Sequence, residues 1–247
     1  MKKLEIAYQK WYSQELHRDM EYKIYGNGKR TMLVFPSQNG RFYDYENFHM
    51  IDVLSSWIEN GSIRVVCCDS IDAETWSDRG GNPRWRIEQH ERWYKYIINE
   101  LIPAVRRGDE TFISTGCSMG GFHSANFFFR RPDIFDTLIA LSGLYHASYF
   151  FGDYSDLLVY SNSPLDYLQY MPADHYYWDI YRHRCIILCV GQGNWEEDLL
   201  ASTRRMDALL REKNVPAWVD YWGYDVAHDW DWWQKQLAYF MQHIINE

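Results

Sequence analysis

Residues 111–122 read Thr-Phe-Ile-Ser-Thr-Gly-Cys-Ser-Met-Gly-Gly-Phe, and this stretch decides the fold. Its first residues have the β-branched and aromatic composition of a strand, and apolar side chains recur at helical spacing after it. Between the two, Gly116 and Gly120 flank Ser118 in a Gly-x-Ser-x-Gly pattern. Such a tight strand-to-helix turn raises a serine hydroxyl at the sheet edge, and the glycines avoid a clash there. The pattern predicts Ser118 as an exposed nucleophile.

The same turn predicts what surrounds the nucleophile. The first N–H groups of the new helix point toward the reacting oxygen, so the amide of Met119 is expected to be one oxyanion donor. Cys117 is the rival nucleophile, but its position in the middle of the turn should direct its side chain into buried packing. The non-catalytic alternative is a glycine-rich β–α turn with a capping serine.

On both sides of this turn, short β-rich runs alternate with segments of helical periodicity. This alternation is typical of an α/β fold, a mostly parallel twisted sheet with helices on both faces, and we expect one domain over 1–247. Run 185–190 (CIILCV) is continuously apolar, as strands covered on both faces tend to be. The irregular stretch 142–180 predicts an insertion over the active site. The expected strands are 4–10 and 20–26 (a leading antiparallel hairpin), 31–35, 63–68, 111–115, 136–141, 185–190 and 216–222, and the expected helices 45–59, 87–106, 119–130, 197–213 and 229–245.

A serine nucleophile needs a base, and in this architecture the base follows the last strand. Of the nine histidines, His228 and His243 lie there. His243 falls deep in the terminal helix, where a solvated side chain is expected, whereas His228 lies in a loop before that helix. We therefore predict His228 as the base. The alternatives are a residue beside a helix cap, or one ligand of a metal site, although no His, Asp or Glu spacing elsewhere completes a metal set.

The acid that orients the base should follow strand 185–190, where the sequence reads Gly191-Gln-Gly-Asn-Trp-Glu-Glu-Asp198. Glu196 is the first carboxylate after the glycine-rich turn and is favoured over Glu197 and Asp198. At least two of the three are expected to be first-turn helix residues stabilised by the helix dipole. The second oxyanion donor should be a backbone N–H of the loop after strand 31–35. Gln38 is the predicted position, with Ser37 and Asn39 as alternatives.

The composition excludes several classes of function. The chain has 25 Lys and Arg against 34 Asp and Glu, a net charge of −9 with no basic block, so we expect no nucleic-acid partner. No run approaches the length of a membrane span, and no membrane association is expected. The five cysteines form no Cys-x-x-Cys pair, and no apolar segment follows Lys2-Lys3, which together favour a cytoplasmic protein. The proposed chemistry needs no metal or organic cofactor, and a homo-oligomer is possible.

Three motifs carry a resemblance to a known family: GCSMGG (116–121), GQGNWE (191–196) and GYDVAHDW (223–230). The chain resembles the putative-esterase branch of the α/β-hydrolase superfamily, which includes S-formylglutathione hydrolases, feruloyl esterases and enterochelin esterases. The resemblance covers nearly the whole chain and implies Ser118 as nucleophile, His228 as base and an acid aligned with Glu196. It also implies oxyanion donors at Met119 and near Gln38. Several relatives have aspartate as the acid, and the loop at 35–40 departs from their His-Gly type.

These observations predict a serine esterase that acts on a small-molecule ester through an acyl-enzyme. The alternatives are an acyltransferase with the same acyl-enzyme, and a non-catalytic binding module on a hydrolase scaffold. The aromatic content is high, at 18%, with 12 Trp and 20 Tyr. Part of this excess is expected to line a substrate pocket, as aromatic rings bury a large apolar surface. The predicted substrate-binding residues are Trp195, Tyr145, His146 and Trp222.

Overall fold

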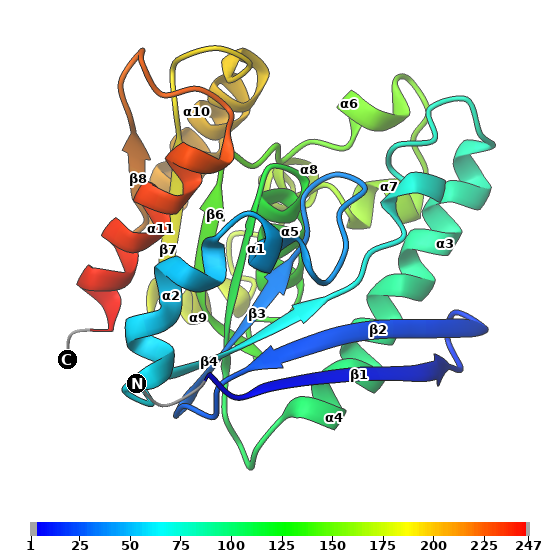
Figure 1. Ribbon diagram of the computed structural model, residues 1–247. Coiled ribbons are helices and arrows are strands. Elements are labelled where there is room, and N and C mark those ends of the chain that lie inside the picture. Colours follow the sequence, from blue (N-terminus) through cyan, green and yellow to red (C-terminus); the bar gives the residue numbers. More distant parts are fainter. Residues whose placement is uncertain (1–3, 246–247) are drawn as a thin grey trace.

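The computed structural model describes residues 4–245, in which eight strands form one twisted sheet in the order β1-β2-β4-β3-β5-β6-β7-β8 (Figure 1). The expected N-terminal hairpin is confirmed, since β1 pairs antiparallel with β2. Strand β2 pairs antiparallel with β4, and the strands from β4 to β8 run parallel. The strand bounds are β1 (Ile6–Ser13), β2 (Arg18–Tyr25), β3 (Arg30–Phe35), β4 (Ile63–Cys68), β5 (Phe112–Cys117), β6 (Phe135–Leu141), β7 (Cys185–Val190) and β8 (Trp218–Tyr221). Met1–Lys3, which include the Lys2-Lys3 pair used in the cytoplasmic prediction, lie outside the described residues.

The helices cover both faces of the sheet, with a large hydrophobic core on each face. On one face, α2 and α11 pack against β-strand side chains such as Val65 and Ile139. On the other face, α3, α5, α8, α9 and α10 cover side chains such as Leu33 and Leu138. The central strands are therefore buried on both faces, as the continuous apolar run 185–190 predicted. The helix bounds are α1 (Asp44–Asn47), α2 (Met50–Glu59), α3 (Pro83–Tyr96), α4 (Ile102–Val105), α5 (Met119–Arg130), α6 (Ser148–Phe151), α7 (Leu157–Ser161), α8 (Pro164–Gln169), α9 (Tyr177–Arg182), α10 (Glu197–Glu212) and α11 (Trp230–Ile244).

Two of the expected helices differ from the structure for local reasons. The helix expected at 45–59 is split, because His49 adopts φ 60° between α1 and α2. The helix expected at 87–106 begins earlier, at Pro83, where the Asn82 side chain accepts a hydrogen bond from the Trp85 N–H. This is an N-cap followed by proline, a start signal that the apolar periodicity did not reveal. A π-helical turn at Ile97–Leu101 then precedes Pro103, which has no N–H for a regular helix.

The stretch 142–180 is mainly a crossover connection and only in part an insertion over the active site. Strand β6 ends at the carboxyl edge of the sheet, and the parallel β7 must start at the opposite edge. The connection returns through α6, α7, α8 and α9, and Trp178 and Tyr181 of α9 are buried in the core. Its beginning lies at the carboxyl edge, and the start of α8 contacts it there, since the Leu165 N–H donates to the Tyr145 carbonyl and the Ala147 N–H to the Ser163 Oγ.

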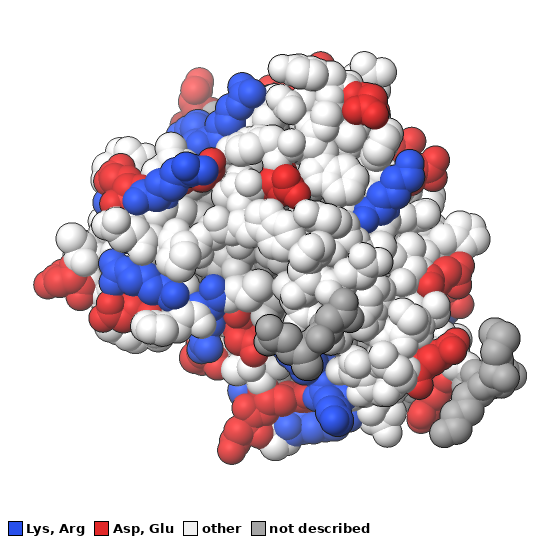
Figure 2. All heavy atoms as spheres, turned by 90° about the vertical axis from the view of Figure 1, so that its left-hand side faces the viewer, with Lys and Arg blue, Asp and Glu red and all other residues white. Residues whose placement is uncertain are grey.

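Aromatic side chains also pack around β8, the last strand in the sheet order. Trp218 of β8 makes edge-to-face contacts with Tyr239 and Phe240 of α11, at centroid distances of 5.6 and 4.9 Å. Figure 2 shows the side of the molecule on which β8 and α11 lie, and its central area is largely free of charged side chains.

None of the helices within residues 4–245 has the length and apolar character needed to cross a membrane.

Candidate active site

Ser118 lies at the carboxyl end of β5, immediately before α5, in a backbone conformation that few non-glycine residues adopt (φ 58°, ψ −120°). The glycines on either side make this turn possible. A Cβ on Gly116 would lie 2.5 Å from the Gly120 carbonyl carbon, and one on Gly120 would lie 2.2 Å from the Phe35 carbonyl oxygen. The backbone of β3 therefore approaches the turn closely, and the expected strand-turn-helix arrangement is present.

His228 reaches this serine from the loop between β8 and α11. Its Nε2 lies 2.9 Å from the Ser118 Oγ, within hydrogen-bond distance. The indole of Trp233, one turn into α11, packs edge-on against the imidazole at a centroid distance of 4.8 Å. His243 is exposed near the end of α11, with its Nδ1 at 2.7 Å from the Tyr239 carbonyl oxygen. The ring of His228 is thus the one that faces the nucleophile turn.

Glu196 lies on the other side of the imidazole. Its Oε2 is 3.4 Å from His228 Nδ1, and neither atom has a hydrogen-bond partner elsewhere in residues 4–245. The residue is 1% exposed, whereas Glu197 and Asp198, in the first turn of α10, point into solvent. The structure therefore singles out Glu196 among the three carboxylates.

The two loops that carry Glu196 and His228 meet because β7 and β8 are neighbours and both end at this edge. The Gly193 N–H donates to the Val226 carbonyl, and the His228 N–H donates to the Asn194 carbonyl. A Cβ on Gly191 would lie 2.2 Å from the Val226 oxygen. Close contact between these loops thus requires glycine, which gives a structural reason for the Gly-x-Gly after β7.

Ser142 is a site residue that the sequence analysis missed. It is the first residue after β6, and its Oγ donates to Glu196 Oε1 at 2.6 Å. The Ser142 Oγ also accepts a hydrogen bond from Trp233 Nε1 at 3.1 Å. Trp233, Ser142 and Glu196 thus form a chain of hydrogen bonds that fixes the carboxylate on the side away from His228. The sequence did contain a signal for Ser142. This serine directly follows the apolar run of β6, and β6 pairs with β5, the strand that ends at Ser118.

A cavity of about 180 Å³ opens beside Ser118. Two rings from the beginning of the crossover, Tyr149 and Phe150, form part of its wall, and Trp195 stands at its rim, 81% exposed. The remaining lining is mostly apolar. The residues are Gln38, Ser118, Met119, Phe122, Leu144, Tyr149, Phe150, Trp195, Leu199 and His228.

Three of the predicted substrate-binding residues do not line this cavity. Tyr145 is 0% exposed and packs in the core below the site, so its ring cannot contact a substrate. His146 lies beside the cavity and pairs with Asp166 at 3.0 Å. Trp222 packs against Tyr239 on the outer edge of the sheet and donates its Nε1–H to Asp220. Proximity in sequence to the site was misleading here, because successive residues of these segments point in different directions.

Both predicted oxyanion positions border the cavity. Met119 is the first residue of α5, and the first N–H groups of a helix have no acceptor within it. Gln38 lies in the loop after β3, and its side-chain amide donates to the Ser77 Oγ at 3.0 Å. Both residues therefore border the cavity beside Ser118.

The rival nucleophile Cys117 does not face the cavity. Cys117 is fully buried, its Sγ lies 3.7 Å from the Tyr45 hydroxyl, and burial raises the pKa of this thiol well above its usual value. Within residues 4–245, no group of three His, Cys, Asp or Glu side chains is arranged to hold a metal ion.

The chain matches the family model described as "Putative esterase" over residues 13–244. Among solved structures, it is similar to a ferulic acid esterase (17% identity, 98% of each chain covered, TM-score 0.76). It is also similar to an S-formylglutathione hydrolase from Staphylococcus aureus (14% identity, 100% of this chain and 99% of that chain covered, TM-score 0.73) and to a fluorophosphonate-binding serine hydrolase from the same organism (13%, 99% of each, TM-score 0.75). No curated protein matches the sequence. These matches confirm the resemblance and the α/β-hydrolase fold: the chain belongs to the putative esterase family and is a carboxylic ester hydrolase.

Proposed function

We propose that this protein is a serine esterase in which Ser118, His228 and Glu196 act as a catalytic triad. The observation that carries the proposal is the distance of 2.9 Å between Ser118 Oγ and His228 Nε2, with a buried carboxylate on the other side of the imidazole. A serine hydroxyl becomes nucleophilic when an adjacent base accepts its proton and a third group orients that base. The solved neighbour described as fluorophosphonate-binding supports the assignment by analogy.

The first half of the reaction forms an acyl-enzyme. Ser118 Oγ attacks the ester carbonyl carbon while its proton passes to His228 Nε2, and the Glu196 carboxylate stabilises the imidazolium. The N–H groups of Met119 and Gln38 donate to the oxygen that becomes negatively charged. When the tetrahedral intermediate collapses, the bond to the alcohol oxygen breaks. His228 gives its proton to that leaving alcohol.

The second half repeats these steps with water. His228 takes a proton from a water molecule, whose oxygen attacks the acyl carbon. The same N–H groups stabilise the second oxyanion. Collapse breaks the bond to Ser118 Oγ, which recovers its proton from His228, and the carboxylic acid leaves. No group beyond this chain and water is needed to balance the reaction.

The cavity limits the part of the ester that it can hold. Its volume of about 180 Å³ is close to that of a protein cavity that binds benzene, about 150 Å³. Phe122, Tyr149 and Phe150 offer aromatic faces and edges to the occupant. We therefore propose an acyl group of about one ring in size as the group bound there.

The proposal is tested by substituting the nucleophile and its rival separately. With p-nitrophenyl acetate, Ser118→Ala should lower kcat by about 10⁴-fold or more. Cys117→Ala should retain the rate, since this thiol is buried away from the cavity. A fluorophosphonate probe should label wild-type protein at the peptide that contains Ser118, as read by mass spectrometry. Hydrolysis by folded Ser118→Ala at the wild-type rate would falsify the assignment.

A further inference from the structure

The segment between β4 and α3, residues 69–82, touches several parts of the site although none of its side chains lines the cavity. Asp72 Oδ1 lies 2.9 Å from Nε2 of His123, which is buried on the nucleophile helix α5. Ser77 accepts the hydrogen bond from the Gln38 side chain. The guanidinium of Arg79 lies 4.7 Å from the ring centre of Tyr149. This segment therefore connects α5, the loop after β3 and the cavity wall.

A buried arginine on α3 holds this segment in place. Arg86 is 2% exposed, and its Nε–H donates to the Thr75 carbonyl at 2.6 Å. One terminal nitrogen donates to the carbonyls of Trp76 and Phe150, both at 3.1 Å. Within residues 4–245, no carboxylate lies at ion-pair distance from this guanidinium. Its charge is stabilised by these three carbonyl dipoles and, at longer range, by the Asp78 carboxylate, and the Phe151 ring centre lies 4.4 Å from Cζ.

The three carbonyls come from two segments that are distant in sequence, so the planar guanidinium fixes their relative position. One of these segments contains Phe150, which lines the cavity. The other contains Trp76, which is fully buried and packs edge-on behind Phe122 at 4.6 Å and Phe150 at 5.4 Å. Phe150 in the cavity wall and Trp76 behind it are therefore both held by the Arg86 guanidinium.

We propose that Arg86 is a positioning residue that sets the acyl preference of the cavity by fixing Phe150 and Trp76. The inference rests on the esterase function proposed above. An acetyl group extends little beyond Ser118 and makes few contacts with Phe150, whereas a benzoyl group fills the cavity. Loss of the guanidinium should therefore affect benzoyl esters more than acetyl esters.

The test compares p-nitrophenyl acetate with p-nitrophenyl benzoate, which share one leaving group. For wild-type protein, Arg86→Lys and Arg86→Met, kcat and KM are measured for both esters. In Arg86→Met, the benzoate-to-acetate ratio of kcat/KM should fall by about 10-fold, mainly through KM for the benzoate. Arg86→Lys keeps the charge but not the planar fork, and its ratio should lie between those of the other two proteins.

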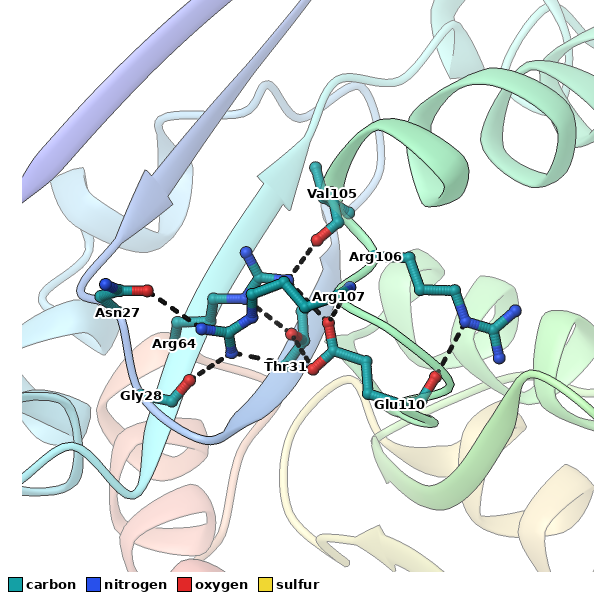
Figure 3. Close-up of polar contacts among 8 residues, drawn as sticks. All are labelled: Asn27, Gly28, Thr31, Arg64, Val105, Arg106, Arg107 and Glu110. Carbon is teal, nitrogen blue, oxygen red and sulfur yellow. Dashed lines mark hydrogen bonds and ion pairs between the residues drawn. The ribbon is translucent and has the colours of Figure 1, made fainter.

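The matched control is a second buried arginine at the opposite end of the sheet (Figure 3). Arg64, near the start of β4, donates to Thr31 Oγ1 and Glu110 Oε1 and also to the Val105 carbonyl. Burial lowers the pKa of Arg64 and of Arg86 alike. Arg64→Met should destabilise the fold but leave the ester ratio within twofold of the wild-type value. An equal change of the ratio in the two Met variants would overturn the proposal.

A double-mutant cycle with Phe150→Ala keeps the proposal testable if Arg86→Met fails to fold. Because Phe150 is the wall residue that Arg86 contacts directly, Arg86→Lys should shift the ratio in the wild-type background and have a clearly smaller effect in the Phe150→Ala background. Additive effects, or an unchanged ratio in folded Arg86→Lys, would contradict the positioning role. If wild-type protein hydrolysed neither ester, or Ser118→Ala were as active, the proposed function itself would fail and this inference with it.

Discussion

At the scale of single residues, the position of Glu196, the candidate acid, depends on one backbone angle and one hydrogen-bond donor. Trp195 adopts φ 68°, and this turn directs the next side chain, Glu196, under the imidazole while Trp195 itself stays exposed. Ser142 at the end of β6 then donates to one carboxylate oxygen and leaves the other for His228. Glu197 and Asp198 begin α10 and remain in solvent, where their charges favour the helix N-terminus.

Glu196→Gln should lower kcat for p-nitrophenyl acetate by about 10²–10⁴-fold with a smaller change in KM, because a neutral amide cannot stabilise the imidazolium. Glu197→Gln is the matched control and should keep the wild-type kcat, since its exposed side chain does not contact His228. Steady-state kinetics at pH 7 distinguish the two. An active Glu196→Gln together with an inactive Glu197→Gln would move the acid by one position.

At the scale of secondary-structure elements, the site is assembled where neighbouring strands end. The strands β5, β6, β7 and β8 carry Ser118, Ser142, Glu196 and His228 at or after their carboxyl ends. The loops after β7 and β8 are then joined by backbone hydrogen bonds. Because a Cβ at position 191 would push the two loops apart, we expect the distance between Glu196 and His228 to depend on glycine there.

Gly191→Ala should therefore reduce kcat by about 10-fold or more while the protein stays folded, because its Cβ would lie 2.2 Å from the Val226 carbonyl oxygen. We expect the free energy of unfolding to fall by about 1–3 kcal/mol from this steric overlap. Urea unfolding and ester hydrolysis measure the two effects.

Gly80→Ala is the control for this substitution. A Cβ at Gly80 would meet no atom within 4 Å, and its backbone is not in the left-handed region. Both kcat and the urea midpoint should stay close to wild-type values. A Gly191→Ala protein that behaves like Gly80→Ala would show that the two loops can separate without affecting the chemistry.

At the scale of the whole molecule, the two edges of the parallel sheet have different roles. The carboxyl edge carries the candidate active site. At the amino edge, Arg64, Thr31 and Glu110 form a polar network between β3, β4 and the loop before β5, and Arg107 contributes a further ion pair to Glu110 at 3.7 Å (Figure 3). Mutations at this edge should therefore change stability without changing the chemistry.

Arg64→Met should lower the free energy of unfolding by about 3 kcal/mol, because it removes a buried cationic partner of the Glu110 carboxylate and the donor to the Val105 carbonyl. Urea denaturation followed by far-UV circular dichroism measures this loss. Arg211→Met is the comparison, since its ion pair with Asp207 forms at the surface, and its urea midpoint should hardly change. Equal midpoints for the two variants would contradict a structural role of the buried network.

Much of the site could be predicted from the chain because its signals are local. The Gly-x-Ser-x-Gly turn needs only neighbouring residues to position Ser118, and the order of serine, acid and histidine follows from successive strands ending at one edge. The alternation of strands and helices likewise reflects local periodicity, and the strand ranges 63–68 and 185–190 agree with β4 and β7. The helix starts that were missed depend on caps and proline, which apolar periodicity does not register.

The sequence by itself thus determined the fold class, the nucleophile turn and the candidate acid and base, because these depend on short-range patterns and chain order. Only the tertiary structure decided which aromatic rings line the cavity, since Tyr149 and Phe150 reach it while Tyr145 and Trp222 pack elsewhere. It also revealed that Ser142 donates to Glu196 and that Arg86 donates to the backbone of Phe150 in the cavity wall. The physical reason is that side-chain direction and long-range hydrogen bonds follow from how distant segments pack, which no local pattern records.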